Sequence, residues 1–182
     1  MKKKVREEFA IVLDFLPMGD SVRGRNFPVA QVIGRDHFIL LEVTPKKGVT
    51  LERGEEVYIG PGKRDKINSI LGKLKYEDLT PIAKEYLERV IEDIVSKKEE
   101  KFVSFFNNAT AITKRLHMLE LLPGIGKKHL WQILEERNKK KFSSFKDIKE
   151  RIKGLPDPKK IIVKRIIMEL KGEDKYRLFV GV

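Results

Sequence analysis

Apolar residues in the first sixty positions occur in short runs that turn residues separate. The runs are rich in Val, Ile, Leu and Phe, with prolines and glycines between them, which is the pattern of short strands joined by turns. Gly34-Arg35-Asp36 lies between two such runs and predicts a hairpin turn. We therefore expect a small β-barrel with strands at residues 9–16, 28–34, 38–43 and 57–59.

Beyond Gly62 the apolar residues recur at helical spacing instead. The spacing is weak between residues 67 and 74 and strong after Leu79, where Thr80 has the residue type of an N-cap and Pro81 that of a first helical position. We predict an amphipathic helix that ends in a stretch of charged residues. A domain boundary is placed in that stretch, between residues 100 and 101.

Residues 101–182 are expected to be mainly helical, with an apolar cluster at residues 102–106 in their interior. Side chains that can cap a helix precede several of the apolar runs, and prolines or glycines follow them. The predicted elements are helices from Thr113 to Leu122, from Lys127 onward, from Ser144 to near Gly154 and from Asp157 to Gly172, and a strand at residues 176–182.

The stretch from residue 121 to residue 134 resembles the helix-hairpin-helix motif. Gly124 and Gly126 allow a tight turn, and Ile125 between them is expected to plug into the helix pair. Backbone N–H groups at the start of the next helix have no partner within it and lie at the positive end of its dipole, which makes a phosphate site. The predicted contacts are Pro123, Gly124, Ile125, Gly126, Lys127, Lys128 and His129. The alternative is a turn that only joins two packed helices.

A second, weaker copy of this pattern covers residues 152–160. Gly154 again precedes an apolar residue, and Lys159 and Lys160 lie at the start of the following helix. Pro156 stands where the first copy has its second glycine and has no N–H, so this copy should bind phosphate less well. Two such hairpins related by a pseudo-twofold axis form the compact domain that we expect here.

The net charge of +12 is concentrated in the C-terminal part. Residues 1–100 contain 19 Lys and Arg against 18 Asp and Glu, whereas residues 101–182 contain 20 against 9, a net of +11. Such a local positive field attracts DNA or RNA most strongly among candidate partners. An acidic protein or an anionic membrane is a weaker candidate.

The composition limits the cellular compartments in which we expect the protein. The chain has no cysteine and is 36% charged, a composition similar to that of heat-adapted proteins. No apolar run approaches the roughly 20 residues of a membrane helix, and no signal segment is recognisable. We expect a cytoplasmic protein without a membrane partner, taken as a monomer.

No motif points to catalysis, a metal or a cofactor. The three histidines lack the spacing of metal ligands, and there is no Walker loop or nucleophile motif. Four acids, Asp14, Asp20, Asp36 and Glu42, could converge in a folded barrel, but dispersal over the surface is the favoured expectation. A binding module is preferred. The alternatives are a nuclease or repair-type enzyme with an acidic metal site not yet located, and a protein-interaction adaptor.

The whole chain resembles a mainly archaeal, uncharacterised family of predicted nucleic-acid-binding proteins, in which an OB-like barrel precedes a helix-hairpin-helix domain. Residues 102–117 and the following hairpin carry the resemblance best, with support from residues 15–17 and 58–60. The resemblance implies an α+β fold with an OB-like β-barrel and trailing helices over residues 1–100. Residues 101–182 would form an all-α double helix-hairpin-helix domain with a C-terminal strand.

Barrels of the OB type commonly hold single strands on basic and aromatic surfaces. The candidates for such contacts in this barrel are Arg23, Arg25, Lys63, Arg64 and Lys66, each of which is equally well explained as ordinary surface charge. The sequence leaves open the choice between DNA and RNA and between single and double strands, because contacts to phosphate are common to all of them.

Overall fold

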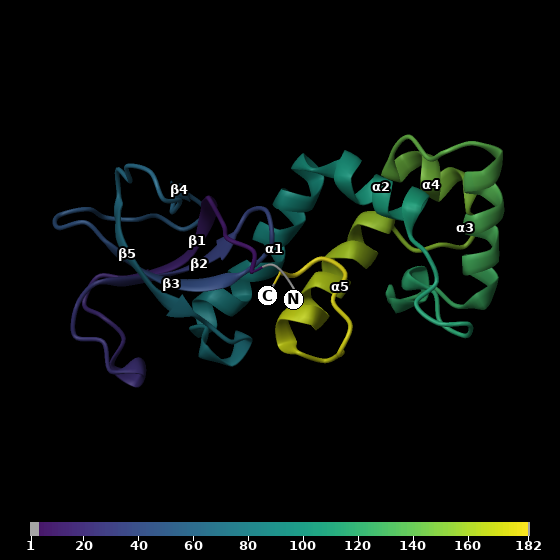
Figure 1. Ribbon diagram of the computed structural model, residues 1–182. Coiled ribbons are helices and arrows are strands. Elements are labelled where there is room, and N and C mark those ends of the chain that lie inside the picture. The colour runs from purple at the N-terminus through teal and green to yellow at the C-terminus, as the bar shows by residue number, and fades with distance from the viewer. Residues whose placement is uncertain (1–3, 182) are drawn as a thin grey trace. The chain divides into compact units, whose positions relative to one another are not determined.

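The computed structural model describes residues 4–181 and shows a mixed α+β protein with two compact units (Figure 1). The sheet unit comprises Met1–Val90 with Glu169–Val182, and the helical unit comprises Ile91–Met168. These units differ from the expected division into 1–100 and 101–182. The C-terminal tail belongs with the sheet, where the Gly181 N–H donates a 2.9 Å hydrogen bond to the His37 carbonyl.

The sheet unit contains one antiparallel sheet in the order β4-β1-β2-β3-β5 (Figure 1). Within the described part of the chain, β4 and β5 are the edges of the sheet, so it is open rather than closed into the expected barrel. The four strands predicted from the first sixty residues are confirmed, and so is the hairpin turn that starts at Gly34. The strands are β1 (Phe9–Leu16), β2 (Val29–Gly34), β3 (Leu40–Pro45), β4 (Glu56–Tyr58) and β5 (Ile67–Lys73).

The helix expected between residues 67 and 74 is wrong, because this segment is strand β5. Ile67 is buried and pairs with Pro45 of β3, whereas Ile70 and Leu71 are each 37% exposed. Register shifts interrupt the pairing of β3 with β5. An edge strand with such irregularities does not alternate cleanly between apolar and polar residues, so its spacing imitates a weak helix.

Helix α1 (Pro81–Lys97) begins where the sequence predicts and is fixed to the sheet at its first turn. Thr80 caps it by accepting a 3.1 Å hydrogen bond from the Ala83 N–H. The same hydroxyl donates to the Asp14 carboxylate at 2.6 Å, and the Thr80 N–H donates to the Gln31 side chain at 2.9 Å. The polar groups of β1 and β2 on this side of the sheet therefore serve to place α1.

Four further α-helices follow α1, and three of the predicted helix starts are confirmed. The side chains of Ser144 and Asp157 cap their helices, since each accepts a backbone N–H two or three residues later at 2.9 and 3.0 Å. Within residues 4–181, no helix is long and apolar enough to cross a membrane. The four helices are α2 (Glu99–Asn108), α3 (Lys127–Lys139), α4 (Phe145–Arg151) and α5 (Pro158–Lys171).

The α-helix predicted from Thr113 to Leu122 is wrong. The Thr113 hydroxyl accepts the N–H groups of Arg115 and Leu116 at 3.2 and 3.0 Å, which closes a local turn instead of capping a helix. An isolated bridge joins Ala111 to His117, and only then does a short 3-10 helix begin, η3 (Met118–Leu121).

The strand predicted at residues 176–182 is also wrong as far as the structure describes it, to residue 181. The buried carboxylate of Glu169 accepts the N–H groups of Leu178, Phe179 and Val180, each at 3.0 Å. These donors therefore end on a side chain of α5 and not on a neighbouring strand.

Candidate nucleic-acid interface

The first predicted hairpin is a tight turn from Leu122 to Ile125. The Ile125 N–H donates to the Leu122 carbonyl at 3.2 Å, and Gly124 has φ +87°. Proline at the second position and a glycine with positive φ at the third are typical of a type II turn. Ile125 is buried, as the plug interpretation requires.

Gly126 is the N-cap of α3 and leaves the start of that helix open. The first bond of the helix is donated by the Leu130 N–H to the Gly126 carbonyl, at 2.9 Å. The N–H groups of residues 126–129 have no acceptor within the described chain. A Cβ added at Gly126 would meet no atom within 4 Å. These four donors are therefore unpaired at the positive end of α3, where residues 126–128 are exposed.

The second predicted hairpin repeats this backbone geometry from Ile152 to Leu155. The Leu155 N–H donates to the Ile152 carbonyl at 3.4 Å, Gly154 has φ +79°, and Leu155 is buried. Both turns therefore have the same three features in the same order: a closing hydrogen bond, a glycine with positive φ and a buried apolar residue after it.

The two turns lie against each other within the helical unit. A Cβ added at Gly124 would lie 3.5 Å from the Pro156 ring, and one at Gly154 would lie 3.8 Å from Nε2 of His129. The other ring nitrogen of His129 is 3.2 Å from the Gly124 carbonyl. His129 therefore lies between the turns and helps to hold them together.

The helix starts that follow the two turns differ in chemistry. Asp157 caps α5 with its own carboxylate, which accepts the Lys159 N–H at 3.0 Å. Pro156 and Pro158 supply no N–H at all. The Asp157 carboxylate therefore already occupies the N-terminal end of α5, whereas the N-terminal end of α3 has no side-chain cap.

The four predicted lysines of the hairpins divide into paired and unpaired ones. Lys127 donates to the Glu120 carboxylate at 2.8 Å and to the Arg115 carbonyl at 3.0 Å, and this contact holds the pKa of Glu120 below its ordinary value. Lys159 pairs with Glu92 at 3.5 Å. Lys128 and Lys160 are exposed and have no ion pair within residues 4–181.

Four of the five predicted contacts on the sheet unit have partners within the protein. Arg23 and Arg25 both pair with the buried carboxylate of Glu42, at 3.3 and 2.9 Å. Arg64 donates to the Gly60 carbonyl at 2.8 Å, and Lys66 pairs with Glu55. Of these five candidates, only Lys63 is exposed without an ion pair in the described residues.

Three arginines of the helical unit are structural, although the sequence counts them in the positive excess. Arg137 donates to the Phe106 and Ala109 carbonyls at the end of α2, at 3.1 and 2.9 Å. Arg151 donates to the Glu136 and Lys140 carbonyls at the end of α3, at 2.6 and 2.7 Å. The buried Arg165 donates to the Leu121 carbonyl at the end of η3, at 3.1 Å.

Three of the four acids considered for a metal site have other side-chain partners. Asp14 accepts from Thr80, Glu42 pairs with two arginines, and Asp36 pairs with Arg35 at 3.5 Å. The fourth, Asp20, precedes the 3-10 helix η1 (Ser21–Arg23), and its carbonyl accepts the Arg23 and Arg25 N–H groups at 3.2 and 2.8 Å. Among the residues that the structure describes, no group of three or more His, Cys, Asp and Glu is placed to hold a metal ion.

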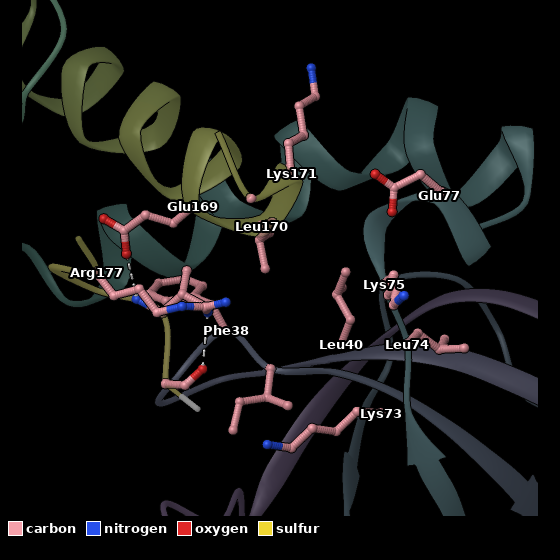
Figure 2. Close-up of a pocket in the computed structure, with 14 residues that line it drawn as sticks. Phe38, Leu40, Lys73, Leu74, Lys75, Glu77, Glu169, Leu170, Lys171 and Arg177 are labelled. Atoms are coloured by element: carbon pink, nitrogen blue, oxygen red, sulfur yellow. Dashed lines mark hydrogen bonds between the residues drawn. The ribbon is translucent and has the colours of Figure 1, made fainter. Parts of the chain in front are cut away.

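A cavity of about 730 Å³ lies in the sheet unit, beside β5 and the end of α5. Figure 2 shows Phe38, Leu40 and Leu170 on its apolar wall and Lys171 extending away from them. Of the charged groups that line it, Glu169 accepts three backbone N–H groups, and Arg177 donates to the Gly181 carbonyl at 3.4 Å.

Trp131 lies on the exposed side of α3, where the sequence analysis named no contact. Leu130 and Ile133 of the same helix are buried, whereas Trp131 is 66% exposed. The helical period contains the signal, because residues 130 and 133 share a face that residue 131 does not.

Comparison with known proteins places the chain among archaeal relatives. A family model described as "Protein of unknown function (DUF655)" matches residues 6–181. "Uncharacterized protein MJ0038" of Methanocaldococcus jannaschii is 51% identical over 176 residues, which are 96% of this chain and 80% of that protein. The crystal structure of Af1531 from Archaeoglobus fulgidus is 49% identical with a TM-score of 0.88, over 96% of this chain and 100% of that one. The expected resemblance to an uncharacterised archaeal family is confirmed at this level.

Proposed function

The chain belongs to the DUF655 family, and we propose that it binds DNA or RNA through the phosphate backbone without reading the base sequence. The contact would be made by the hairpin surface, which we define as residues 122–129 together with the adjoining turn at residues 152–155. Phosphate oxygens would accept hydrogen bonds from the N–H groups at the start of α3.

One observation carries this proposal: the start of α3 is open while the start of α5 is closed. Both helices follow turns of the same geometry, yet Asp157 supplies a carboxylate to α5 and Gly126 supplies no side chain to α3. An exposed helix start with unpaired N–H groups is the arrangement in which an external anion is bound.

We assign the two turns to a helix-hairpin-helix pair as part of this proposal. Their matching hydrogen bond, left-handed glycine and buried plug support the assignment, as does their contact through Pro156 and His129. The first hairpin departs from the motif, because its first helix is the short 3-10 helix η3. The order and apolar core of the sheet support an OB-like half-barrel in the other unit.

Charge supports the same surface. The helical unit has 19 Lys and Arg against 10 Asp and Glu, a net of +9, whereas the sheet unit has 20 against 17, a net of +3. The exposed lysines that remain after the structural arginines are set aside provide a field that attracts a polyanion without specifying its sequence.

The test is a salt titration of binding to labelled single- and double-stranded DNA and RNA, with the wild type and Gly126→Val. Affinity for duplex should fall by about 0.9 log unit per log unit of salt for each phosphate contacted. Gly126 has φ −99° and open space at its Cβ position, so the valine variant should fold normally. It should nevertheless bind much more weakly, because its side chain occupies the approach to the N–H groups.

Lys128→Ala is the matched control, since it removes charge at the same place and leaves the backbone donors accessible. It should reduce the slope of log affinity against log salt concentration by the amount expected for about one phosphate contact. A Gly126→Val protein with wild-type melting temperature and wild-type affinity would remove the hairpin from the mechanism. Magnesium-dependent cleavage of the same probes would favour the enzyme alternative.

A further inference from the structure

We infer that Trp131 stacks on an unpaired base, so that the hairpin surface prefers nucleic acid with unstacked bases over a regular duplex. This inference rests on the proposed function and adds to it the class of nucleic acid bound. Trp131 would supply the contact to a base, and the start of α3 would supply the contact to the adjoining phosphate.

The position of Trp131 on α3 joins it to the phosphate site. It lies three residues after Lys128 and four after Lys127, so all three side chains share one face of the helix. The open N–H groups of residues 126–129 are therefore within about one helical turn of the indole ring, roughly 5 Å along the axis. The sugar-phosphate link of one nucleotide spans a comparable distance.

The exposure of Trp131 is exceptional within its unit. It is 66% exposed, and it is the one exposed large apolar side chain among the described residues 91–168. A protein partner or a membrane surface is bound by a group of neighbouring apolar side chains, which this surface lacks. A lone aromatic ring among lysines instead matches the chemistry of a base, which is planar and apolar and is attached to a charged phosphate.

Lys128 is the cation of this face that keeps its charge available, because it is exposed and has no ion pair within the described residues. The acidic residue that follows Trp131 by four positions, Glu135, lies 3.5 Å from the ammonium of Lys139, which also pairs with Glu136 at 2.9 Å.

The experiment uses the fact that Trp131 is the only tryptophan of the chain. Its intrinsic fluorescence would be followed while the intact protein is titrated with an oligothymidine of about 12 nucleotides, within the range of single-strand site sizes. The same sequence as a blunt duplex, and heparin as a polyanion without bases, serve as the other two probes. Binding of each probe is measured in parallel by a method that does not depend on Trp131.

Stacking predicts strong quenching by the single strand, weaker quenching by the duplex and none by heparin. Trp131→Leu should weaken binding of the single strand by on the order of tenfold and leave binding of heparin unchanged, while Trp131→Phe should lie between wild type and leucine. Because the ring is exposed, the melting temperature of both variants should equal that of the wild type.

Two results would overturn the inference in distinguishable ways. If the single strand binds but neither quenches Trp131 nor loses affinity in Trp131→Leu, the stacking contact is wrong while the proposed function stands. If heparin binds but neither nucleic acid binds more tightly than heparin at any salt concentration, the proposed function fails and the stacking contact fails with it.

Discussion

At Gly126 the missing side chain matters for access, whereas at Gly124 it matters for conformation. Gly124 has φ +87°, a backbone region that other residues adopt only with strain, while Gly126 has an ordinary negative φ and open space around it. Two glycines of one motif thus have different physical roles. Substitution at Gly126 tests binding, and substitution at Gly124 mainly tests folding.

Glu120 is the residue that limits the charge of the hairpin surface. Its carboxylate accepts from the Lys127 ammonium and also from the His117 N–H at 3.1 Å, where it completes the cap of η3. The carboxylate thereby neutralises one of the two lysines that the sequence predicts as phosphate contacts.

Glu120→Gln should therefore tighten binding of nucleic acid. The amide oxygen can still accept from the His117 N–H, but the acidic charge is gone and Lys127 is released. We expect a gain of about two- to fivefold at low salt and a salt slope steeper by up to about 0.9, measured by the same titration. Adding Lys127→Ala should abolish the gain. If the gain persists in the double variant, Lys127 is not its source.

At the scale of elements, side chains that close the helix ends hold the helical unit together. Arg137, Arg151 and Arg165 donate to the last carbonyls of α2, α3 and η3 respectively. Each satisfies acceptors that the end of a helix leaves open. These cations stabilise the scaffold that carries the hairpin turns, and they are not free to meet a phosphate.

Arg151→Ala should consequently reduce stability more than binding. The variant loses the hydrogen bonds to the Glu136, Lys140 and Lys141 carbonyls and the ion pairs with Glu136 and Asp147 at 3.5 and 3.2 Å. It also loses the stacking of the guanidinium on Phe142, whose ring centre is 4.5 Å away. We expect a loss of about 1–3 kcal/mol in the free energy of unfolding, measured by urea denaturation. The affinity of the folded fraction should remain within about twofold of wild type, in contrast to Lys128→Ala. A large loss of affinity with an unchanged free energy of unfolding would instead assign Arg151 to the nucleic-acid interface.

At the scale of the whole molecule, the distribution of charge should decide where nucleic acid binds. Lys128 and Lys160 are exposed in the first turns of α3 and α5, and Lys47 and Lys63 are exposed in loops of the sheet unit. Reversing either pair changes the net charge by the same amount. The two double variants therefore separate a local site from a general effect of net charge.

Replacing both Lys128 and Lys160 by Glu should weaken binding by roughly 10- to 100-fold at about 0.1 M salt, because two phosphate contacts become repulsive. Replacing both Lys47 and Lys63 by Glu should weaken binding by less than about threefold. Equal losses in the two double variants, measured at the same salt concentration, would mean that net charge alone drives binding.

Local sequence patterns predicted the elements whose signals lie within a few residues. The strands of the first sixty residues, the caps at Thr80, Ser144 and Asp157 and both glycine turns are of this kind. Two of the wrong predictions concern segments whose structure a distant group decides. Edge strand β5 depends on irregular pairing with β3, and the tail after α5 is held by Glu169.

The sequence by itself determined the α+β class, the two glycine turns and the positive excess, because backbone propensities, capping side chains and charge are properties of the local chain. Only the tertiary structure decided which cations remain available, since Lys127 and Arg23 are paired with acids 7 and 19 residues away. It also decided that the two turns meet, because the contacts of Gly124 with Pro156 and of Gly154 with His129 join segments that are separated in sequence.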